Sequence, residues 1–147
     1  MAVASIYGVD ILEDNARECR ERLYGIVESE SRAAIKGAVE LLFLDAVRYV
    51  LEKNILCGDA LTRKNALGEP ITFAEWSVVT GDKVKRRDFR LDEMLEGNVD
   101  KGQTRSLFGA GNNPAVDWEY DEETKSFIPS PIREFPLMSF YEVMDVA

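Results

Sequence analysis

Hydrophobic positions between residues 33 and 51 recur at the spacing of an α-helix and define two apolar faces. The main face follows the i, i+3, i+4 and i+7 pattern: Ile35, Ala38, Val39, Leu42, Phe43, Ala46, Tyr49 and Val50. A second apolar row lies among the charged positions: Gly37, Leu41, Leu44 and Leu51. Two apolar faces require two partners, because water solvates neither of them well. One partner is the core of the domain, and the other is a further element of this chain or another subunit.

A one-sided amphipathic helix is predicted over residues 11–29, after a short strand at residues 5–9. Its apolar side chains are spaced by three and four positions: Leu12, Ala16, Cys19, Leu23, Ile26 and Val27. Because Cys19 belongs to this apolar row, we expect it to be a small buried hydrophobic residue rather than a reactive thiol. The two helices form either a tight helical hairpin or one long bent helix.

Two shorter helices are predicted from local end signals. Thr72 and Glu75 have the spacing of a capping box, which favours a third helix over residues 73–80. Asp88 is suited to begin a fourth helix, over residues 89–96. Both segments lie between glycines, which agrees with short helices.

Acidic residues gather on a predicted β-hairpin at residues 116–128, after a polar, glycine-rich loop at residues 98–114. They form a candidate acidic face: Asp117, Glu119, Asp121, Glu122 and Glu123. Alternate carboxylates on a strand could hold a divalent cation, but the spacing lacks the glycine and the final glutamate of an EF-hand loop. We therefore expect a solvated acidic face and no metal.

The last nineteen residues combine prolines with an apolar end. Pro129, Pro131 and Pro136 favour an extended backbone, and seven of the last eleven residues are apolar residues larger than alanine. A stiff spacer with an apolar end predicts a docking arm, with these partner-binding residues: Phe135, Leu137, Met138, Phe140, Tyr141 and Met144. The alternative is a last strand or short helix that folds back onto its own domain. A free arm predicts that deletion of residues 135–147 leaves the fold intact.

These elements together predict an α+β fold that is mostly helical. It would contain two N-terminal amphipathic helices, two short helices, a small β-hairpin and an extended C-terminal arm. The predicted division is one compact domain at residues 1–128 and the arm at residues 129–147. A chain of 147 residues is long enough to bury a core without metals or disulfides.

The composition excludes several classes of chemistry. The chain has no histidine and two cysteines, so histidine-dependent acid–base catalysis and a standard structural zinc site are ruled out. We expect no catalytic residue and no cofactor. The net charge is −9, and residues 116–147 hold eight acids and two bases, which disfavours direct binding to nucleic acid or an anionic membrane. The one basic cluster, KVKRR at residues 83–87, predicts pairing within the chain or with an acidic patch on a neighbouring subunit.

The sequence therefore favours a protein that binds other proteins and is not an enzyme. We expect a subunit of a homo-oligomer or multi-protein assembly, such as a repeated structural component of a virion, located in the cytoplasm or in the virion. The alternative is an acidic inhibitor or immunity-type protein whose acidic face covers a basic nucleic-acid-binding site on its target.

Overall fold

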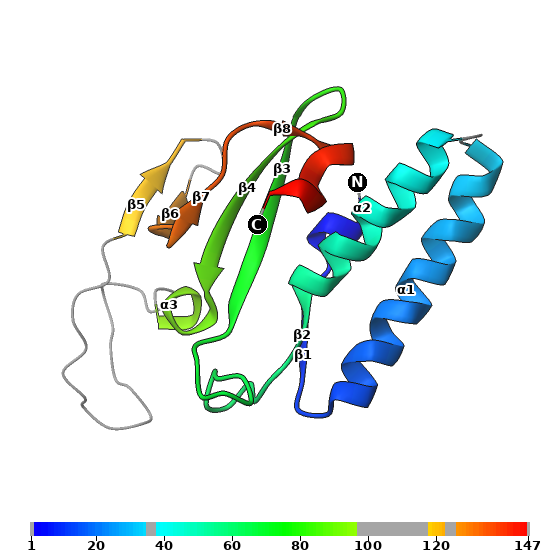
Figure 1. Cartoon of the computed structure of the whole chain (residues 1–147). Coiled ribbons are helices and arrows are strands. Elements are labelled where there is room, and N and C mark those ends of the chain that lie inside the picture. Colours follow the sequence, from blue (N-terminus) through cyan, green and yellow to red (C-terminus); the bar gives the residue numbers. More distant parts are fainter. Residues whose placement is uncertain (1, 35–37, 97–117, 123–125, 147) are drawn as a thin grey trace, which may run out of the picture.

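The computed structural model describes residues 2–34, 38–96, 118–122 and 126–146. Its main elements form three layers, with α1 outside, α2 in the middle and a four-stranded antiparallel sheet on the other side of α2 (Figure 1). The elements in chain order are η1 (Ala2–Ser5), β1 (Gly8–Asp10), α1 (Glu13–Ala34), α2 (Ala38–Asn54), β2 (Ile55–Cys57), β3 (Thr72–Thr80), β4 (Lys83–Arg90), α3 (Leu91–Glu96), β5 (Trp118–Asp121), β6 (Ser126–Pro129), β7 (Arg133–Glu134), β8 (Met138–Ser139) and η2 (Phe140–Asp145).

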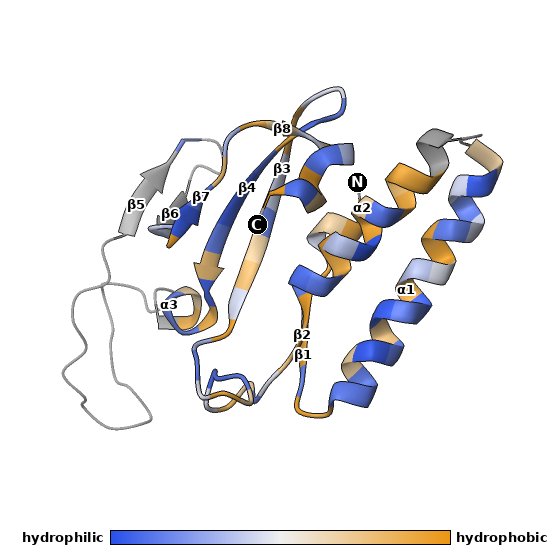
Figure 2. Ribbon diagram, viewed as in Figure 1, coloured by the Kyte–Doolittle hydropathy of each residue, from blue (hydrophilic) through white to orange (hydrophobic). Residues whose placement is uncertain are grey.

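The two long helices confirm the prediction from hydrophobic spacing. Colouring by hydropathy shows α2 as the more apolar of the two (Figure 2). From the second apolar row of α2, Leu44 and Leu51 are buried, and Leu51 lies at the bottom of the groove between α1 and α2. Leu41 stays 68% exposed. Most of the second face is therefore covered by the chain itself. Cys19 is exposed on α1, so the expectation that it is buried is wrong.

An N-terminal strand is present as β1, but it begins at Gly8, and Ser5, the predicted start, belongs to η1. β1 pairs in parallel with β2 and places Gly8 opposite Ile55. Asp10 then starts the first helix, since its Oδ1 accepts a hydrogen bond from the backbone N–H of Leu12 (2.8 Å). The parallel pair joins the start of α1 to the end of α2, and this fixes the two helices as an antiparallel pair.

The prediction of a mostly helical fold is wrong. Residues 73–80, predicted as a helix, belong to β3, which pairs with β4 from Thr72 opposite Arg90 to Val78 opposite Val84. β7 and β8 pair with the other edge of β4 and complete the sheet. The capping-box signal is overridden because the segment is rich in β-branched and aromatic residues and gains a full ladder with residues 83–90.

Two other local predictions are confirmed in kind and corrected in extent. The fourth predicted helix is present as α3, but Phe89 and Arg90 end β4 instead of starting the helix. The predicted hairpin is present as β5 and β6, with Trp118 opposite Pro129. The predicted loop at residues 98–114 lies outside the described residues.

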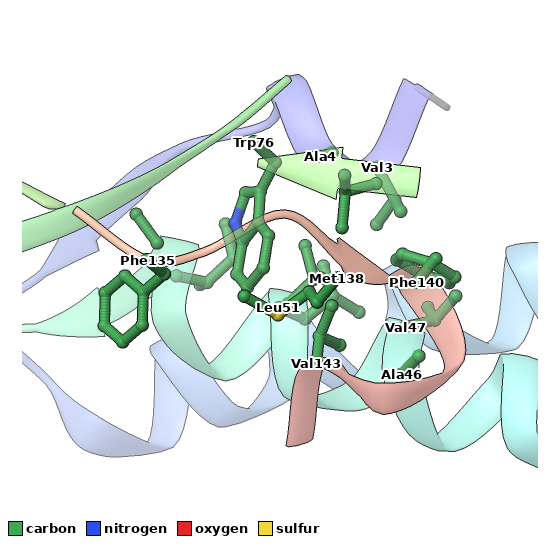
Figure 3. Packing of buried hydrophobic residues seen from close by; sticks show 14 of the residues in the cluster. Val3, Ala4, Ala46, Val47, Leu51, Trp76, Phe135, Met138, Phe140 and Val143 are labelled. Atoms are coloured by element: carbon green, nitrogen blue, oxygen red, sulfur yellow. The ribbon is translucent and has the colours of Figure 1, made fainter. Parts of the chain in front are cut away.

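The C-terminal segment packs on its own domain. Four of its side chains are at most 7% exposed and belong to the main hydrophobic core: Phe135, Met138, Phe140 and Val143. Figure 3 shows η2 folded over α2, with Val143 beside Leu51 and Phe140 beside Val47. Residues 129–146 therefore lie against the predicted domain of residues 1–128 and not apart from it.

A buried polar network joins this segment to the sheet and to α2. Arg86 Nε and Nη2 donate to the two carboxylate oxygens of Asp88 (2.8 and 2.9 Å), and Arg86 Nη1 donates to the hydroxyl of Tyr49 (3.0 Å). The guanidinium lies 4.1 Å from the ring centre of Phe135. The Tyr49 hydroxyl donates in turn to the carbonyl of Val146 (3.1 Å). The network thus holds both ends of residues 135–146.

A second polar contact anchors the same segment at the surface, and it carries a pH-dependent prediction. Ser139 Oγ donates to Asp82 Oδ2 (2.5 Å), and this bond lowers the pKa of Asp82 below its ordinary value of 3.8. A lowered folded-state pKa stabilises the protein above the unfolded-state pKa, and the effect is lost as the pH falls through the folded-state pKa. We expect Ser139→Ala to lower the free energy of unfolding at pH 7. The difference in this free energy between the variant and wild type should become smaller below about pH 4. Urea unfolding across pH 2–7 measures this.

The control for this prediction is Asp82→Asn, which keeps a similar shape but cannot ionise. In the Asp82→Asn background, Ser139→Ala should show the same loss of stability at every pH. A difference that still narrows at low pH would assign the effect to another group.

Candidate functional site

An apolar groove lies on the face of the sheet that points away from α2. It encloses about 250 Å³, and the residues that line it define the outer-face groove: Tyr7, Phe73, Glu75, Arg87, Phe89, Met94 and Pro129. Four separate parts of the chain contribute: the link between η1 and β1, the β3–β4 pair, α3, and the end of β6.

Strand alternation explains why this face is apolar. Ala74 and Trp76 of β3 point into the core, so Phe73 and Glu75 point to the outer face. The antiparallel register places Phe73 opposite Phe89 and Glu75 opposite Arg87. Such cross-strand aromatic and opposite-charge pairs stabilise a sheet, so the residues of the groove also hold its shape.

The walls of the groove are fixed by contacts among their own side chains. Arg87 Nε donates to Glu75 Oε2 (2.9 Å), and the Arg87 guanidinium lies 5.6 Å from the ring centre of Phe89. Tyr7 packs edge-on against Phe73, with ring centres 5.5 Å apart. Burial raises the pKa of the Tyr7 phenol, and the nearby Glu75 carboxylate adds to the increase. A tyrosine phenol is already neutral at physiological pH with its ordinary pKa of 10.0, and the increase keeps the Tyr7 phenol so.

The arrangement is suited to binding apolar side chains. Sites for small molecules typically enclose about 300–1,000 Å³ and contain several convergent polar groups. The outer-face groove is smaller, and its charged pair, Glu75 and Arg87, is mutually neutralised. Among the residues that the structure describes, no cysteine, serine or threonine lines it. Its aromatic walls resemble the pockets that accept anchor residues at protein interfaces.

A larger groove of about 510 Å³ runs between α1 and α2, but its charges are already balanced. Arg17 pairs with Asp14 (3.0 Å), and Arg20 pairs with Glu13 (2.7 Å) and donates to the carbonyl of Ile55 (2.8 Å). The lining also contains two acids, an aromatic ring and a third arginine: Glu21, Glu52, Tyr24 and Arg48, whose guanidinium lies 4.4 Å from the Tyr24 ring centre. The lining thus mixes acids and bases, and Arg17 and Arg20 are already bonded within the chain.

Among the described residues, no group of three or more His, Cys, Asp or Glu side chains is arranged to hold a metal. Burial raises the pKa of the Cys57 thiol, with a further increase from Glu13, so this cysteine is not activated as a thiolate. Its Sγ lies 3.6 Å from the carbonyl of Ile11.

The structure does not bring the six predicted partner-binding residues together on the surface. Phe135, Met138 and Phe140 are buried in the core, and Tyr141 and Met144 are half-buried. Only Leu137 is exposed, at 55%. Three of the six side chains therefore stabilise the fold, and partner binding through Leu137, Tyr141 and Met144 stays a prediction.

The predicted acidic face stays a prediction. Glu122 is exposed, whereas Asp117 and Glu123 lie outside the described residues. Glu119 and Asp121 belong to β5, and their side chains also lie outside what the structure describes.

Sequence reasoning did not find the outer-face groove; of its residues it had singled out only Arg87 for a contact with a partner, as part of the basic cluster at residues 83–87. The alternation in residues 72–80 could have revealed the groove. On a strand, Phe73, Glu75 and Ser77 point to one face of the sheet, and Ala74, Trp76 and Val78 point to the other. On a helix, which we predicted for this segment, the two sets of side chains would not be separated in this way.

No family model, curated protein or solved structure matches this chain. None of the helices that the structure describes is long and apolar enough to cross a membrane. The function is therefore inferred from the geometry of the groove and the surface around it.

Proposed function

We propose that this protein is a non-enzymatic assembly subunit, which binds other protein subunits through the outer-face groove. The observation that carries the proposal is an apolar, aromatic-walled hollow on the sheet face opposite α2. The setting we propose is a repeated structural component of a large assembly such as a virion.

The surface beside the groove supports a protein partner. Met94 and Tyr7 of the groove wall are 41% and 44% exposed, and their sequence neighbours Leu95 and Ile6 are 47% and 36% exposed. These exposed apolar side chains belong to the same segments as the groove wall. Exposed apolar surface beside a pocket is typical of sites that bind other proteins.

The polar chemistry of the molecule supports a binding role over a catalytic one. Most ionisable side chains on the described helices and strands are engaged with a neighbour on the same chain, as in the Arg86–Asp88 and Arg87–Glu75 pairs. Such pairs stabilise a scaffold, and the acid and the base that line the outer-face groove, Glu75 and Arg87, are bonded to each other.

Met94→Glu tests the proposal, because it places a charge on the lip of the groove without removing a buried side chain. We expect wild-type protein to self-associate and Met94→Glu to weaken that association at least about 30-fold, the effect of losing a hot spot of about 2 kcal/mol. Sedimentation equilibrium or light scattering after size exclusion, over a concentration series, gives the two dissociation constants.

The matched control is Leu61→Glu, which introduces the same charge at a leucine that is 93% exposed and lies outside the groove. It should associate as the wild type does. Wild-type protein that stays monomeric at all concentrations, or equal loss in both variants, would contradict the proposal.

A further inference from the structure

Residues 133–146 pack on the rest of the domain as one unit, which we call the closing segment. Its strands β7 and β8 pair with β4, with Arg133 opposite Asp88 and Met138 opposite Val84. Its η2 packs on α2, and Figure 1 shows the orange-to-red chain beside β4 and over α2. The surface that receives the closing segment is therefore made by α2 and β4, and we call it the receiving surface.

The receiving surface is complementary to the closing segment in apolar character, ring stacking and charge. Phe140 is 6% exposed in the core formed with α2. The Arg86 guanidinium of β4 lies 4.1 Å from the ring centre of Phe135, and Lys85 Nζ lies 3.8 Å from Glu134 Oε2. The structure thus shows directly what covers this surface, which is a closing segment of this protein.

A stiff hinge of three residues, 130–132, joins β6 to the closing segment. Pro129 ends β6 and Pro131 lies within the hinge. Each proline fixes its own φ and restricts the residue before it to extended conformations, so residues 128–131 favour a straight path. The chain nevertheless bends at Ile132, whose backbone N–H donates to the carbonyl of Asp88 (2.9 Å). The bend that brings the closing segment to its own receiving surface is therefore confined to one position.

Exchange of closing segments between two copies keeps the contacts of the segment and changes only the path of the hinge. Each receiving surface still holds an identical segment, so the burial and the ion pairs are the same in both forms. The balance between one-chain packing and exchange is then decided by the hinge and by the protein concentration. A hinge that favours a straight path supports the exchanged form.

We infer that two copies of this protein assemble by exchanging closing segments, so that residues 133–146 of each copy cover the receiving surface of the other. The pair is closed, because each copy gives one segment and receives one. The exchange takes place while the chains fold, since a folded copy would have to remove four side chains from its core to release the segment. It does not use the outer-face groove, which we propose to act among folded copies.

Disulfide trapping can detect the exchange, because Lys83 of β4 lies opposite Ser139 of β8. The backbone N–H of Phe140 donates to the carbonyl of Asp82 (2.8 Å), which makes the adjacent Lys83–Ser139 pair a non-hydrogen-bonded pair. The Cα atoms of such pairs are typically about 4.5 Å apart, within the range of a disulfide. Cysteines at these two positions should therefore link wherever a closing segment meets a receiving surface.

The experiment places the two cysteines in separate chains. One chain carries Lys83→Cys and the other Ser139→Cys, and both carry Cys19→Ser and Cys57→Ser. The chains are mixed in urea, refolded together at high concentration and oxidised, and circular dichroism checks that each is folded. We expect a covalent heterodimer whose fraction rises with protein concentration during refolding. Mass spectrometry should find the peptide with position 83 joined to the peptide with position 139.

Two controls separate the exchange from other contacts. A single chain with both Lys83→Cys and Ser139→Cys, refolded alone at low concentration, should form the same disulfide within itself. The heterodimer should also form when both single-cysteine chains carry Met94→Glu, because the exchange does not involve the groove. If Ser139→Cys does not fold, Arg87→Cys and Glu134→Cys replace the pair, since these residues are opposite each other between β4 and β7.

Each outcome decides the inference. If the control chain forms its internal disulfide and the mixture gives no link between the two positions, the segment stays on its own domain and the inference is overturned. It is also overturned if the link disappears in the Met94→Glu background, because the copies then meet only through the groove. A link that persists there supports the exchange. If Met94→Glu at the same time leaves the association of folded copies unchanged, the proposed function fails while the exchange stands.

Discussion

Deletion of residues 135–147 is expected to unfold the protein. The deleted segment carries four core side chains, Phe135, Met138, Phe140 and Val143. Burial of a large apolar side chain contributes about 1.5–3 kcal/mol, so their loss amounts to about 6–12 kcal/mol. This equals most or all of the roughly 5–15 kcal/mol by which a domain is usually stable. Circular dichroism and the dispersion of amide signals in a proton–nitrogen spectrum would show the loss of structure.

Point substitutions in the same segment show whether stability depends on its buried side chains or only on the length of the chain. Phe140→Ala should cost about 3–5 kcal/mol, because Phe140 is 6% exposed and packs against the Phe43 ring at 5.7 Å. Leu137→Ser, at an exposed position, should change stability by less than about 0.5 kcal/mol. If the protein without residues 135–147 still unfolds cooperatively, with a midpoint of unfolding near that of wild type, the segment is a free arm and not part of the core.

Arg86→Ala should be the most damaging single substitution at a charged position. It leaves the buried Asp88 carboxylate without its two guanidinium hydrogen bonds and removes the partner of the Tyr49 hydroxyl. Breaking one half of a buried ion pair typically costs about 3–5 kcal/mol, mainly because the remaining charge is unpaired. Urea unfolding at pH 7, monitored by circular dichroism, gives the difference in free energy.

The double variant Arg86→Met with Asp88→Leu tests the reason for that loss. If the unpaired carboxylate is the main cost, removing both charges should be less destabilising than Arg86→Ala alone. Equal losses in the two proteins would show that packing of the arginine between Trp76 and Phe135 matters more than its charge.

The sequence was sufficient for features that depend on local spacing. The two long helices follow from apolar residues three and four positions apart, and Asp10 marks the real start of the first one. The β5–β6 hairpin follows from alternation around a polar turn. These signals lie within a few residues of each other, so no knowledge of distant partners is needed.

Features that depend on distant pairing could not be predicted in the same way. Thr72 and Glu75 match a capping box, yet the ladder between β3 and β4 determines the structure of that segment. The C-terminal apolar residues have the same composition whether they bind a partner or their own core. The outer-face groove combines Tyr7, Phe89 and Pro129, residues that are brought together only by the completed fold.

The packing of both chain ends on α2 has a consequence for synthesis. Near one end, the carbonyl of Ala4 accepts a hydrogen bond from Asn54, and near the other Phe140 and Val143 close the core. A ribosome releases the chain from its first residues onward, so the helices emerge long before the segment that covers them. Until residue 143 leaves the exit tunnel, the apolar side of α2 has no cover from η2. Folding of α2 against its full set of partners should therefore wait until residues 135–146 have emerged, and a chaperone that shields exposed apolar helices should increase the yield.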